Sequence, residues 1–456
     1  MAVMEVCALA QLSGLKVCPQ LLVGQGSVRQ ICVELESAGR FDVMTAEKLR
    51  EDVCGILKVK EAGDIVSPSL EDHESSAILL TGATGFLGAR ILVTLLRDTA
   101  VDLVCLVRGV ESHHARQRLL ESLNRNRIEL ARSDLDRVEV IAGDIALKKF
   151  GWTGEFFSEL ASRIDKVIHS AAKVNMVANY DSLRPANVVG VNRIADFVAA
   201  TSTRKLDYIS TLSVFVGTDR FQGAMLESDD LSRTARVYGG YAQSKWAAEV
   251  LLRDRTDIQT RFFRLGLLTA DTETGVFPKM DLLTLAIKGL DRLGYAPNVE
   301  DGLKVDITPV NYAAEAIASI SQQSTEPDTF HVAHPVGLSA DALIQNVRAV
   351  CPHIKIVSIE QFEMKVKSAK LDWKTASACL GLGRALSNWN SKEPMPFDLF
   401  QATNAKFDMT NSSKFIFSSL KPPVLDDQFV QRLISQIVSN ESQSEKSESQ
   451  EVAGNV

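Results

Sequence analysis

The sequence predicts an α/β protein whose centre is a doubly wound parallel sheet. Six short apolar runs alternate with helical patterns in the middle of the chain, which is typical of strands that are buried on both faces. One of these runs leads directly into a glycine-rich turn, and a helical segment follows at once. The six expected strands are 77–80, 102–107, 138–142, 166–171, 206–211 and 261–266.

The chain of 456 residues is long enough for two or three structural units. Its N-terminal part contains two amphipathic helix patterns, and in the second Leu49, Val53, Ile56 and Leu57 recur on one face after Thr45, a suitable N-cap. We expect a helical segment at 1–60, a polar linker at 61–76, the sheet domain at 77–270, a smaller substrate-binding lobe at 271–440 and a disordered tail at 441–456.

Composition and charge exclude several classes of protein. A net charge of -7 argues against a nucleic-acid binder and offers no basic surface for an anionic membrane. No apolar run reaches the ~18 residues that a membrane span needs, and Glu5 interrupts the apolar N-terminus, which reads as part of a fold and not as a signal peptide.

The cysteines and histidines indicate no metal site. The seven cysteines are scattered without a Cys-x-x-Cys pair, so neither a disulfide framework nor a zinc site is expected, and a reducing cytoplasm fits. The seven histidines show no metal-ligand spacing. His331 and His334 lie in the apolar run FHVAHP and are interpreted as strand or loop residues.

The strand at 77–80 runs into a glycine motif. Gly82, Gly85 and Gly88 form the pattern Gly-x-x-Gly-x-x-Gly before the helical segment ARILVTLLRD. The first glycine permits a tight turn, the second lets the backbone approach a pyrophosphate, and the third lets helix and strand pack closely. The free N–H groups at the helix start attract phosphates. The motif therefore predicts a dinucleotide site in preference to a merely structural turn.

The residue after the second strand bears on which dinucleotide binds. NAD-binding sheets place a carboxylate there for the ribose 2′-hydroxyl, whereas Arg108 follows the strand at 102–107. An arginine can bind a 2′-phosphate through two hydrogen bonds, and Arg118 lies in the next helix. Arg116, taken alone, is better explained as part of a solvated basic face. The pair Arg108 and Arg118 favours NADPH as the cofactor.

Two further strand ends suit a dinucleotide. Asp144 follows the third strand, where its carboxylate could accept a hydrogen bond from an adenine amino group. Ala171 and Ala172 follow the fourth strand, where small side chains leave room for a cofactor that crosses the sheet edge. His169 precedes this edge on an apolar strand and is expected to be structural.

A tyrosine and a lysine open the helical segment YAQSKWAAEVLLRD. The spacing of Tyr241 and Lys245 puts both on one helix face. A tyrosine hydroxyl has a reference pKa of about 10, and a neighbouring ammonium would lower that pKa. Thr211 ends the fifth strand and could polarise a substrate carbonyl. Tyr-x-x-x-Lys is common by chance, so its position one strand–helix unit after Thr211 is what makes it informative.

These residues predict a carbonyl reductase. NADPH would deliver a hydride to the carbonyl carbon while Tyr241 donates a proton to the developing oxyanion. Thr211 would hydrogen-bond that oxygen in the transition state. Lys245 would tune Tyr241 and could hold the nicotinamide ribose.

Together the motifs resemble the extended short-chain dehydrogenase/reductases, which have a Rossmann fold. More narrowly, they resemble the thioester reductase domains of non-ribosomal peptide synthetases, polyketide synthases and carboxylic acid reductases. The resemblance covers about 77–440, including Trp373 in a region like the lobe that receives an acyl-phosphopantetheine arm. The matching stretches are LLTGATGFLGARIL, CLVRG, GDI, HSAAKVN, NVVGVNRI, YISTLSVF, YAQSKWAAE and FRLGLL.

The resemblance implies which residues contact NADPH or the reacting carbonyl. The glycine and Tyr/Lys motifs are shared by the whole superfamily, whereas the arginine pair, HSAAKVN and YISTLSVF narrow it. Besides the glycines of the turn, the implied contacts are Thr84, Gly85, Phe86, Leu87, Arg108, Arg118, Asp144, Ile145, Ala171, Ala172, Lys173, Thr211, Tyr241 and Lys245.

The resemblance also implies the substrate, an acyl thioester on the phosphopantetheine of a carrier protein or on CoA. Reduction would release an aldehyde, and a second round could give the alcohol. The stretch GQGSV looks like a carrier-protein site in which a serine after an aspartate is modified, but Gly26 stands in place of that aspartate. Ser27 is therefore interpreted as a working carrier site, a degenerate remnant or a coincidental helix cap.

Other classes of protein share some of these residues. A fatty acyl-CoA reductase shares the glycine and Tyr/Lys motifs but often carries a membrane-seeking C-terminal region, which this sequence does not show. A non-catalytic NADP-sensing regulator on the same fold tends to lose the tyrosine or the lysine, and here both Tyr241 and Lys245 are present. A sugar epimerase or dehydratase would want an acidic residue where Arg108 stands.

Overall fold

The structure is a computed structural model, and several sequence expectations fall on residues that it does not describe. These are the GQGSV stretch with Ser27, the linker at 61–76, Trp373 and the tail at 441–456. The described residues are 43–59, 77–175, 178–215, 222–231, 234–278, 281–299, 304–323, 328–372, 375–376, 378–380, 382, 404–416 and 420–439.

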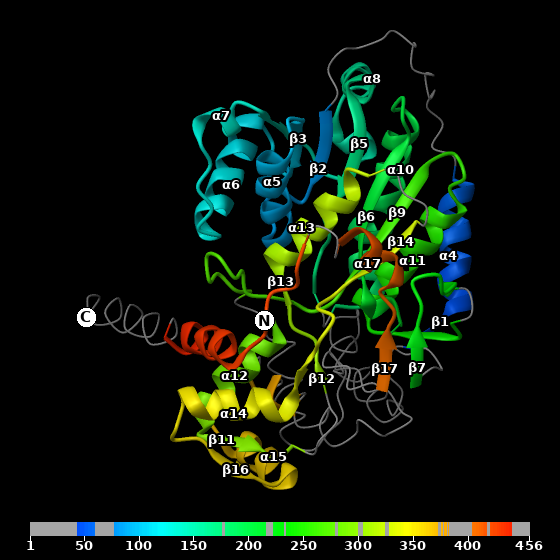
Figure 1. Cartoon of the computed structure of the whole chain (residues 1–456). Coiled ribbons are helices and arrows are strands. Elements are labelled where there is room, and N and C mark those ends of the chain that lie inside the picture. Colours follow the sequence, from blue (N-terminus) through cyan, green and yellow to red (C-terminus); the bar gives the residue numbers. More distant parts are fainter. Residues whose placement is uncertain are drawn as a thin grey trace, which may run out of the picture.

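A seven-stranded parallel sheet forms the centre of the described molecule (Figure 1). Its strand order is β14-β9-β6-β5-β2-β3-β4, so the direction in which strands are added reverses between β2 and β5. All six predicted runs form strands of this sheet, and the predicted fold class is confirmed. The strands are β2 (Ala77–Thr81), β3 (Asp102–Val107), β4 (Val138–Ala142), β5 (Ile164–His169), β6 (Lys205–Thr211), β9 (Gln259–Leu265) and β14 (Thr329–Val332).

Helices cover both faces of the sheet, and this is why its strands are so apolar. Successive residues of β2 point to opposite faces: Leu79 joins an apolar core that includes Trp246 of α11, and Leu80 joins a second core that includes Ile317 of α13. The elements around the sheet are α5 (Phe86–Asp98), α6 (Ser112–Arg125), α7 (Arg132–Leu135), η1 (Lys148–Gly151), α8 (Gly154–Arg163), α9 (Tyr180–Arg184), η2 (Pro185–Val189), α10 (Gly190–Ala199), η3 (Leu212–Phe215), α11 (Gly240–Asp254) and α13 (Val310–Ser321).

The described N-terminal residues share the core of the sheet domain. Thr45 caps α4 (Ala46–Lys58) by accepting a hydrogen bond from the Lys48 amide, and Leu49, Val53 and Ile56 are buried, so this amphipathic helix is confirmed. The strand before it, β1 (Val43–Thr45), pairs antiparallel with β8 (Arg236–Tyr238). Because α4 packs on α11, the segment covers the helix that carries Tyr241.

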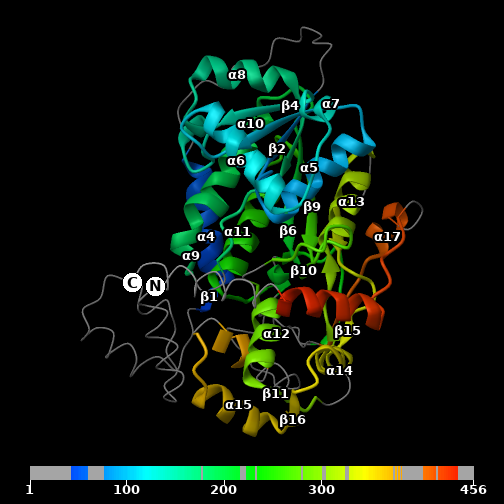
Figure 2. The ribbon, with the colours of Figure 1, turned by 90° about the vertical axis from the view of Figure 1, so that its left-hand side faces the viewer.

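A smaller lobe has a third apolar core of its own, which includes Leu290, Val347, Phe362 and Ile434. Figure 2 shows its helices grouped at one end of the sheet. The border expected at residue 270 stays a prediction, and α13 and β14, which follow it in the sequence, belong to the sheet. The lobe and its connections comprise β10 (Leu268–Thr269), α12 (Leu282–Leu293), β11 (Tyr295–Pro297), β12 (Lys304–Val305), β13 (Thr308–Pro309), β15 (Leu338–Ser339), α14 (Ala340–Val350), β16 (Lys355–Val357), α15 (Ile359–Ser368) and the helix at 427–439.

A segment beyond the lobe returns to the sheet domain. β17 (Asn404–Phe407) pairs in parallel with β7 (Gln222–Met225), and α17 (Thr410–Ile416) packs on α13 and β14. The buried Glu227 carboxylate accepts hydrogen bonds from the backbone amides of His331, Asn411 and Ser412. This carboxylate therefore ties the loop after β7 to both β14 and α17.

Candidate active site

The glycine turn after β2 is a backbone cradle. Gly82 has a φ of +78°, and a Cβ on it would lie 2.6 Å from the backbone nitrogen of Ala171, so no other residue fits there without strain. A Cβ on Gly88 would overlap the carbonyl oxygen of Gly82. Gly85 is the N-cap of α5, and no side-chain cap occupies the helix start. The first turn of α5 therefore presents free N–H groups, as phosphate binding requires.

The loop after β5 is held against this turn. The Thr81 hydroxyl shares a hydrogen bond with Nδ1 of the buried His169 (2.7 Å) and accepts another from the Ala171 amide (3.2 Å). This contact places Ala171 and Ala172, both half-buried, at the crevice between β2 and β5. In doubly wound sheets the ligand binds at such a reversal of strand order.

Asn187 is a site residue that sequence reasoning missed. Its buried amide accepts a hydrogen bond from the Lys173 amide (2.8 Å) and donates to the Lys173 carbonyl (3.1 Å) and to the Ser244 hydroxyl (3.1 Å). Asn187 thus joins the loop after β5 to α11, beside Lys245. It lies in the stretch NVVGVNRI, but only the three-dimensional contacts reveal what it does.

The two arginines expected to bind a 2′-phosphate lie together. Arg108 follows β3 and Arg118 lies on α6, both are exposed, and the Arg118 guanidinium donates to the Arg108 carbonyl oxygen. The other predicted contacts at this end lie on the loops after β2 and β4. Thr84 and Phe86 are half-buried, Leu87 is buried, and Asp144 and Ile145 are half-buried after β4.

Thr211, Tyr241 and Lys245 come to one side of β6, although no hydrogen bond among the described residues joins them directly. Thr211 ends β6, and Tyr241 is half-buried near the start of α11. Lys245 is buried, and its ammonium donates to the carbonyl of Ile209 on β6 (2.6 Å) and lies 4.3 Å from the ring centroid of Tyr208.

The pKa of Tyr241 departs from the sequence expectation. Burial raises it to about 12, because the ammonium of Lys245 is directed to the Ile209 carbonyl and not to the phenol. Burial also lowers the pKa of Lys245 to about 7, partly opposed by the carboxylate of Glu249. A phenol with a raised pKa stays protonated at neutral pH, as a proton donor must.

A fully buried ion pair supports this end of the site. Glu249 lies one turn beyond Lys245 on α11, and its carboxylate pairs with Arg264 of β9 (2.8 Å) and accepts a hydrogen bond from the Ser210 hydroxyl. The side chains of Glu249 and Arg264 are both 0% exposed, so the pairing is what permits their burial. The pair connects the catalytic helix to two strands of the sheet.

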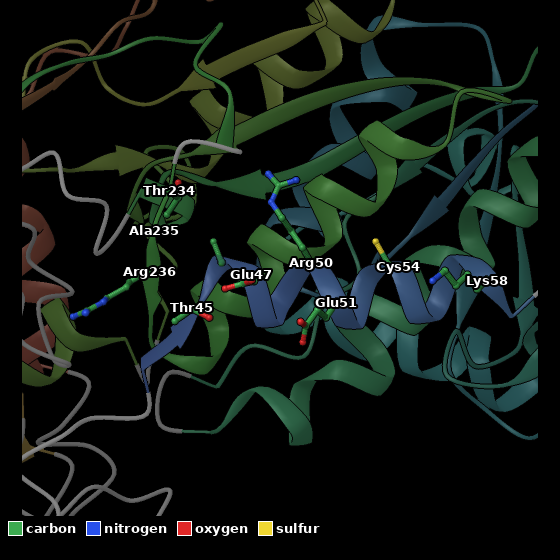
Figure 3. Close-up of a pocket in the computed structure, with 10 residues that line it drawn as sticks. Thr45, Glu47, Arg50, Glu51, Cys54, Lys58, Thr234, Ala235 and Arg236 are labelled. Carbon is green, nitrogen blue, oxygen red and sulfur yellow. The ribbon is translucent and has the colours of Figure 1, made fainter.

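Two other features lie outside this constellation. An open groove of about 910 Å³ runs along α4 and is lined by residues such as Arg50, Glu51 and Arg236 (Figure 3). It mixes acidic and basic side chains, so its charge selects no class of partner. None of the predicted site residues lines it.

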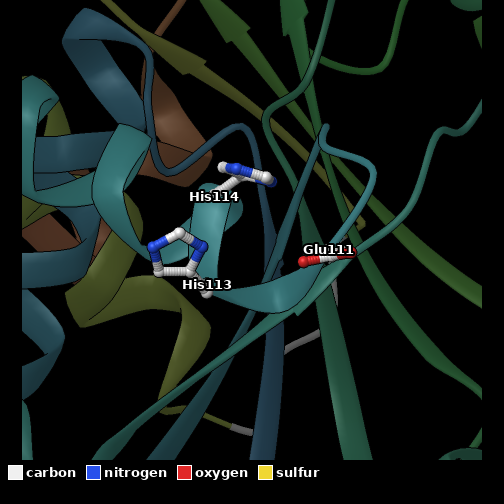
Figure 4. A group of neighbouring side chains, drawn as sticks. All are labelled: Glu111, His113 and His114. Carbon is white, nitrogen blue, oxygen red and sulfur yellow. The ribbon is translucent and has the colours of Figure 1, made fainter.

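The described residues also bring together three side chains that could ligate a metal. Glu111, His113 and His114 lie at the start of α6 with their ligand atoms within 4.8 Å of one another (Figure 4). All three are exposed, and within the described part of the chain no hydrogen bond orients the two imidazoles. Histidines that bind metals are normally oriented by such bonds, so the group lacks the support of a built metal site.

The fold and the site define an NAD(P)-binding oxidoreductase of the extended short-chain dehydrogenase/reductase class. The chain belongs to the family described as male sterility protein, which matches residues 80–317. Among the described residues no helix is long and apolar enough to cross a membrane.

Curated relatives agree with this assignment. The chain is 32% identical to a large subunit of the linear gramicidin synthase of Brevibacillus parabrevis over 326 residues, which cover 70% of this chain and 6% of that protein. It is 31% identical to L-2-aminoadipate reductase of Saccharomyces cerevisiae over 287 residues, 59% of this chain and 20% of that protein. The chain thus spans a fifth or less of the length of these two relatives.

A solved structure of similar extent also matches. The terminal R domain from the myxalamid PKS-NRPS biosynthetic pathway superposes with a TM-score of 0.71 and 26% identity. The match covers 85% of this chain and 98% of that domain, so nearly the whole of that domain has a counterpart here. The resemblance to reductase domains of peptide and polyketide synthetases is therefore confirmed.

Proposed function

We propose that this protein reduces an acyl thioester to an aldehyde with NADPH. The observation that carries the proposal is the placement of Thr211, Tyr241 and Lys245 beside the β2–β5 crevice, with the glycine turn at the same edge of the sheet. The relatives that match are reductases or large synthetases, which supports a thioester substrate. A second reduction, from the aldehyde to the alcohol, uses the same groups.

A dinucleotide suits the residues that are present. The turn at Gly82 and Gly88 has no room for a Cβ, and the start of α5 has free N–H groups for a pyrophosphate. Thr84, Gly85, Phe86 and Leu87 would line this turn, and Asp144 and Ile145 would lie beside the adenine. Ala171, Ala172 and Lys173 would border the nicotinamide half. When bound, NADPH supplies the hydride.

The protein's own groups do the rest of the chemistry. Tyr241 donates its proton to the carbonyl oxygen as the hydride reaches the carbonyl carbon, and Thr211 donates a hydrogen bond to the same oxygen. The resulting thiohemiacetal collapses: its carbon–sulfur bond breaks, the thiol leaves with a proton, and the aldehyde remains. Lys245, held at the Ile209 carbonyl, lies on the Tyr241 face of α11 and is placed to bind the ribose.

The choice of NADPH over NADH rests on Arg108 and Arg118. Their guanidinium groups lie on adjacent elements at the end of β3, where a ribose 2′-phosphate would fall, and no carboxylate follows the strand directly. Both side chains are exposed and therefore accessible to a phosphate. Two arginines that contact one phosphate discriminate strongly against a hydroxyl.

The proposed substrate is carried on the phosphopantetheine arm of a carrier protein, or on CoA, in a reducing cytoplasm. Myxalamid and gramicidin synthetases are named for assembled products, and the matching parts there are R domains or portions of synthetases. The described cysteines are all free thiols, which fits a reducing setting. A carrier-related origin for the segment around Ser27 remains part of this proposal.

The test is NADPH oxidation with acyl-CoA and acyl-pantetheine thioesters, comparing the wild type with Tyr241→Phe. We expect thioester-dependent oxidation that falls at least ~100-fold in the variant, while NADPH still binds. A wild type that binds NADPH but reduces neither thioesters nor free aldehydes would instead support a regulator on the same fold. Turnover that prefers long-chain acyl-CoA over acyl-pantetheine would favour a fatty acyl-CoA reductase.

A further inference from the structure

Thr211 is engaged by a second hydroxyl residue two positions along the chain. The Thr211 hydroxyl donates a hydrogen bond to the Ser213 hydroxyl oxygen (3.1 Å). The backbone amide of Ser213 donates in return to the Thr211 hydroxyl oxygen (3.1 Å). Both residues are half-buried at the point where β6 passes into η3.

This arrangement decides where the single hydroxyl hydrogen of Thr211 points. A hydroxyl has one hydrogen to donate and two lone pairs, and the Ser213 amide already uses one lone pair. The hydrogen is directed to Ser213, so it must rotate away before Thr211 can donate to a substrate oxygen. Once it has rotated, the Ser213 hydroxyl is placed to donate to the second lone pair of Thr211.

A chain of hydrogen bonds that all run in one direction strengthens its last member. If Ser213 donates to Thr211 through both its amide and its hydroxyl, the Thr211 hydroxyl becomes more polarised and a better donor. The gain appears only when negative charge develops on the substrate oxygen, because only then does Thr211 turn toward it. The contact would therefore affect turnover more than binding.

The surroundings of Ser213 argue against a role in packing. Its neighbours Leu212, Val214 and Phe215 are buried in the core, whereas Ser213 is half-buried between them. Among the described residues, the only hydrogen-bond partner of its side chain is Thr211. A small apolar side chain could therefore replace the hydroxyl with little structural effect.

We propose that Ser213 is a positioning residue that makes Thr211 a stronger hydrogen-bond donor to the reacting carbonyl oxygen. The proposal rests on the proposed function, in which Thr211 acts on that oxygen. It assigns to Ser213 a hydroxyl that switches from accepting the Thr211 hydrogen in the resting site to donating to Thr211 during the reaction.

The experiment compares Ser213→Val with Ser213→Thr, which have nearly the same shape but differ in the hydroxyl. We expect Ser213→Val to lower kcat for thioester reduction about tenfold, the effect of one ordinary hydrogen bond, with KM for NADPH unchanged. Ser213→Thr should retain most of the turnover. Equal turnover in the two variants would overturn the proposal.

A double-mutant cycle with Thr211→Val shows whether Ser213 acts through Thr211. Once the threonine hydroxyl is absent, Ser213→Val should cause no further loss, so the two effects should be far from additive. Additive losses would overturn the proposal, because Ser213 would then act independently of Thr211. Thr211→Val at full activity would instead overturn the proposed function itself, so the two failures are distinguishable.

Folding is checked by thermal unfolding and NADPH titration of every variant. If Ser213→Val melts well below the wild type, Ser213→Ala replaces it in the cycle, since the smaller side chain cannot clash. A turnover loss that accompanies a matching loss of NADPH affinity in both apolar variants would overturn the proposal in favour of a structural role. A turnover loss with NADPH affinity intact supports it.

Discussion

The two ends of the candidate site are built from different materials. At the phosphate end the cradle is backbone, since Gly82 and Gly88 leave no room for a side chain, and the charged groups are exposed. At the catalytic end the working groups are side chains, and Lys245 and the pair Glu249–Arg264 are buried. The first end therefore depends on residue type at fixed spacing, whereas the second depends on partners far apart in the sequence.

Breaking the backbone cradle should have the largest effect. In Gly88→Ala the new Cβ meets the Gly82 carbonyl, which cannot rotate away, so we expect the free energy of unfolding to fall by about 3 kcal/mol or more and NADPH binding to be lost. Thermal unfolding and NADPH fluorescence titration measure both effects.

Two other glycines provide the controls for that variant. A Cβ on Gly85 would lie 3.2 Å from the Gly82 carbonyl oxygen, so Gly85→Ala should fold and show weaker NADPH binding. Gly55 in α4 has nothing within 4 Å, so Gly55→Ala should leave the site intact and stabilise the helix by up to ~1 kcal/mol. Wild-type NADPH affinity in Gly88→Ala would contradict the backbone account of this end.

Removing the exposed charges should have an intermediate effect confined to the cofactor. Arg108→Ala and Arg118→Ala should each weaken NADPH binding about 10- to 100-fold, leave NADH binding unchanged and alter stability little, because both side chains are exposed. High salt should reduce the difference between wild type and variants. Arg116→Ala is the matched control on α6 and should bind NADPH normally. A parallel loss of NADH binding would show that the arginines do not read the 2′-phosphate.

The buried end should respond to pH, with a smaller effect on stability. Burial lowers the pKa of His169 to about 3 from 6.5, so the folded protein keeps the imidazole neutral while the unfolded chain takes up a proton below pH 6.5. Stability should therefore fall as the pH falls from 6.5 toward 3. The neutral variant His169→Gln, although less stable overall, should show a flatter dependence, by up to ~2 kcal/mol between pH 7 and pH 5.

Urea unfolding at several pH values measures that difference. The buried His331, whose pKa burial also lowers to about 3, is present in both proteins and cancels in the comparison. Identical slopes for the wild type and His169→Gln would show that His169 is not held neutral by burial.

Sequence patterns predicted most of the sheet because buried parallel strands are continuous apolar runs. β5 lies at Ile164–His169, two residues earlier than expected at both ends. β14 and α13 fall within the range expected for the lobe, because a short apolar run in the C-terminal half carries no signal for the sheet that it joins. Chain order alone does not reveal that the sheet is completed after an excursion.

The candidate site divides in the same way. The glycines, the arginine pair and Tyr241 could be found by type and spacing, and their placement supports that interpretation. Asn187 and the ion pair Glu249–Arg264 could not, because their roles come from contacts between distant segments. The raised pKa of Tyr241 was missed for the same reason, since helix spacing does not show that Lys245 turns toward the Ile209 carbonyl.

The pairing of β1 with β8 sets a rule for transplanting this reductase into another assembly line. Residues 43–45 hold the strand that ends at Tyr238, three positions before Tyr241, and α4 covers the buried Trp246. A recombination junction placed between α4 and β2 would take away this strand partner and uncover the helix that bears the proton donor. A junction upstream of Val43 keeps the exchanged module whole.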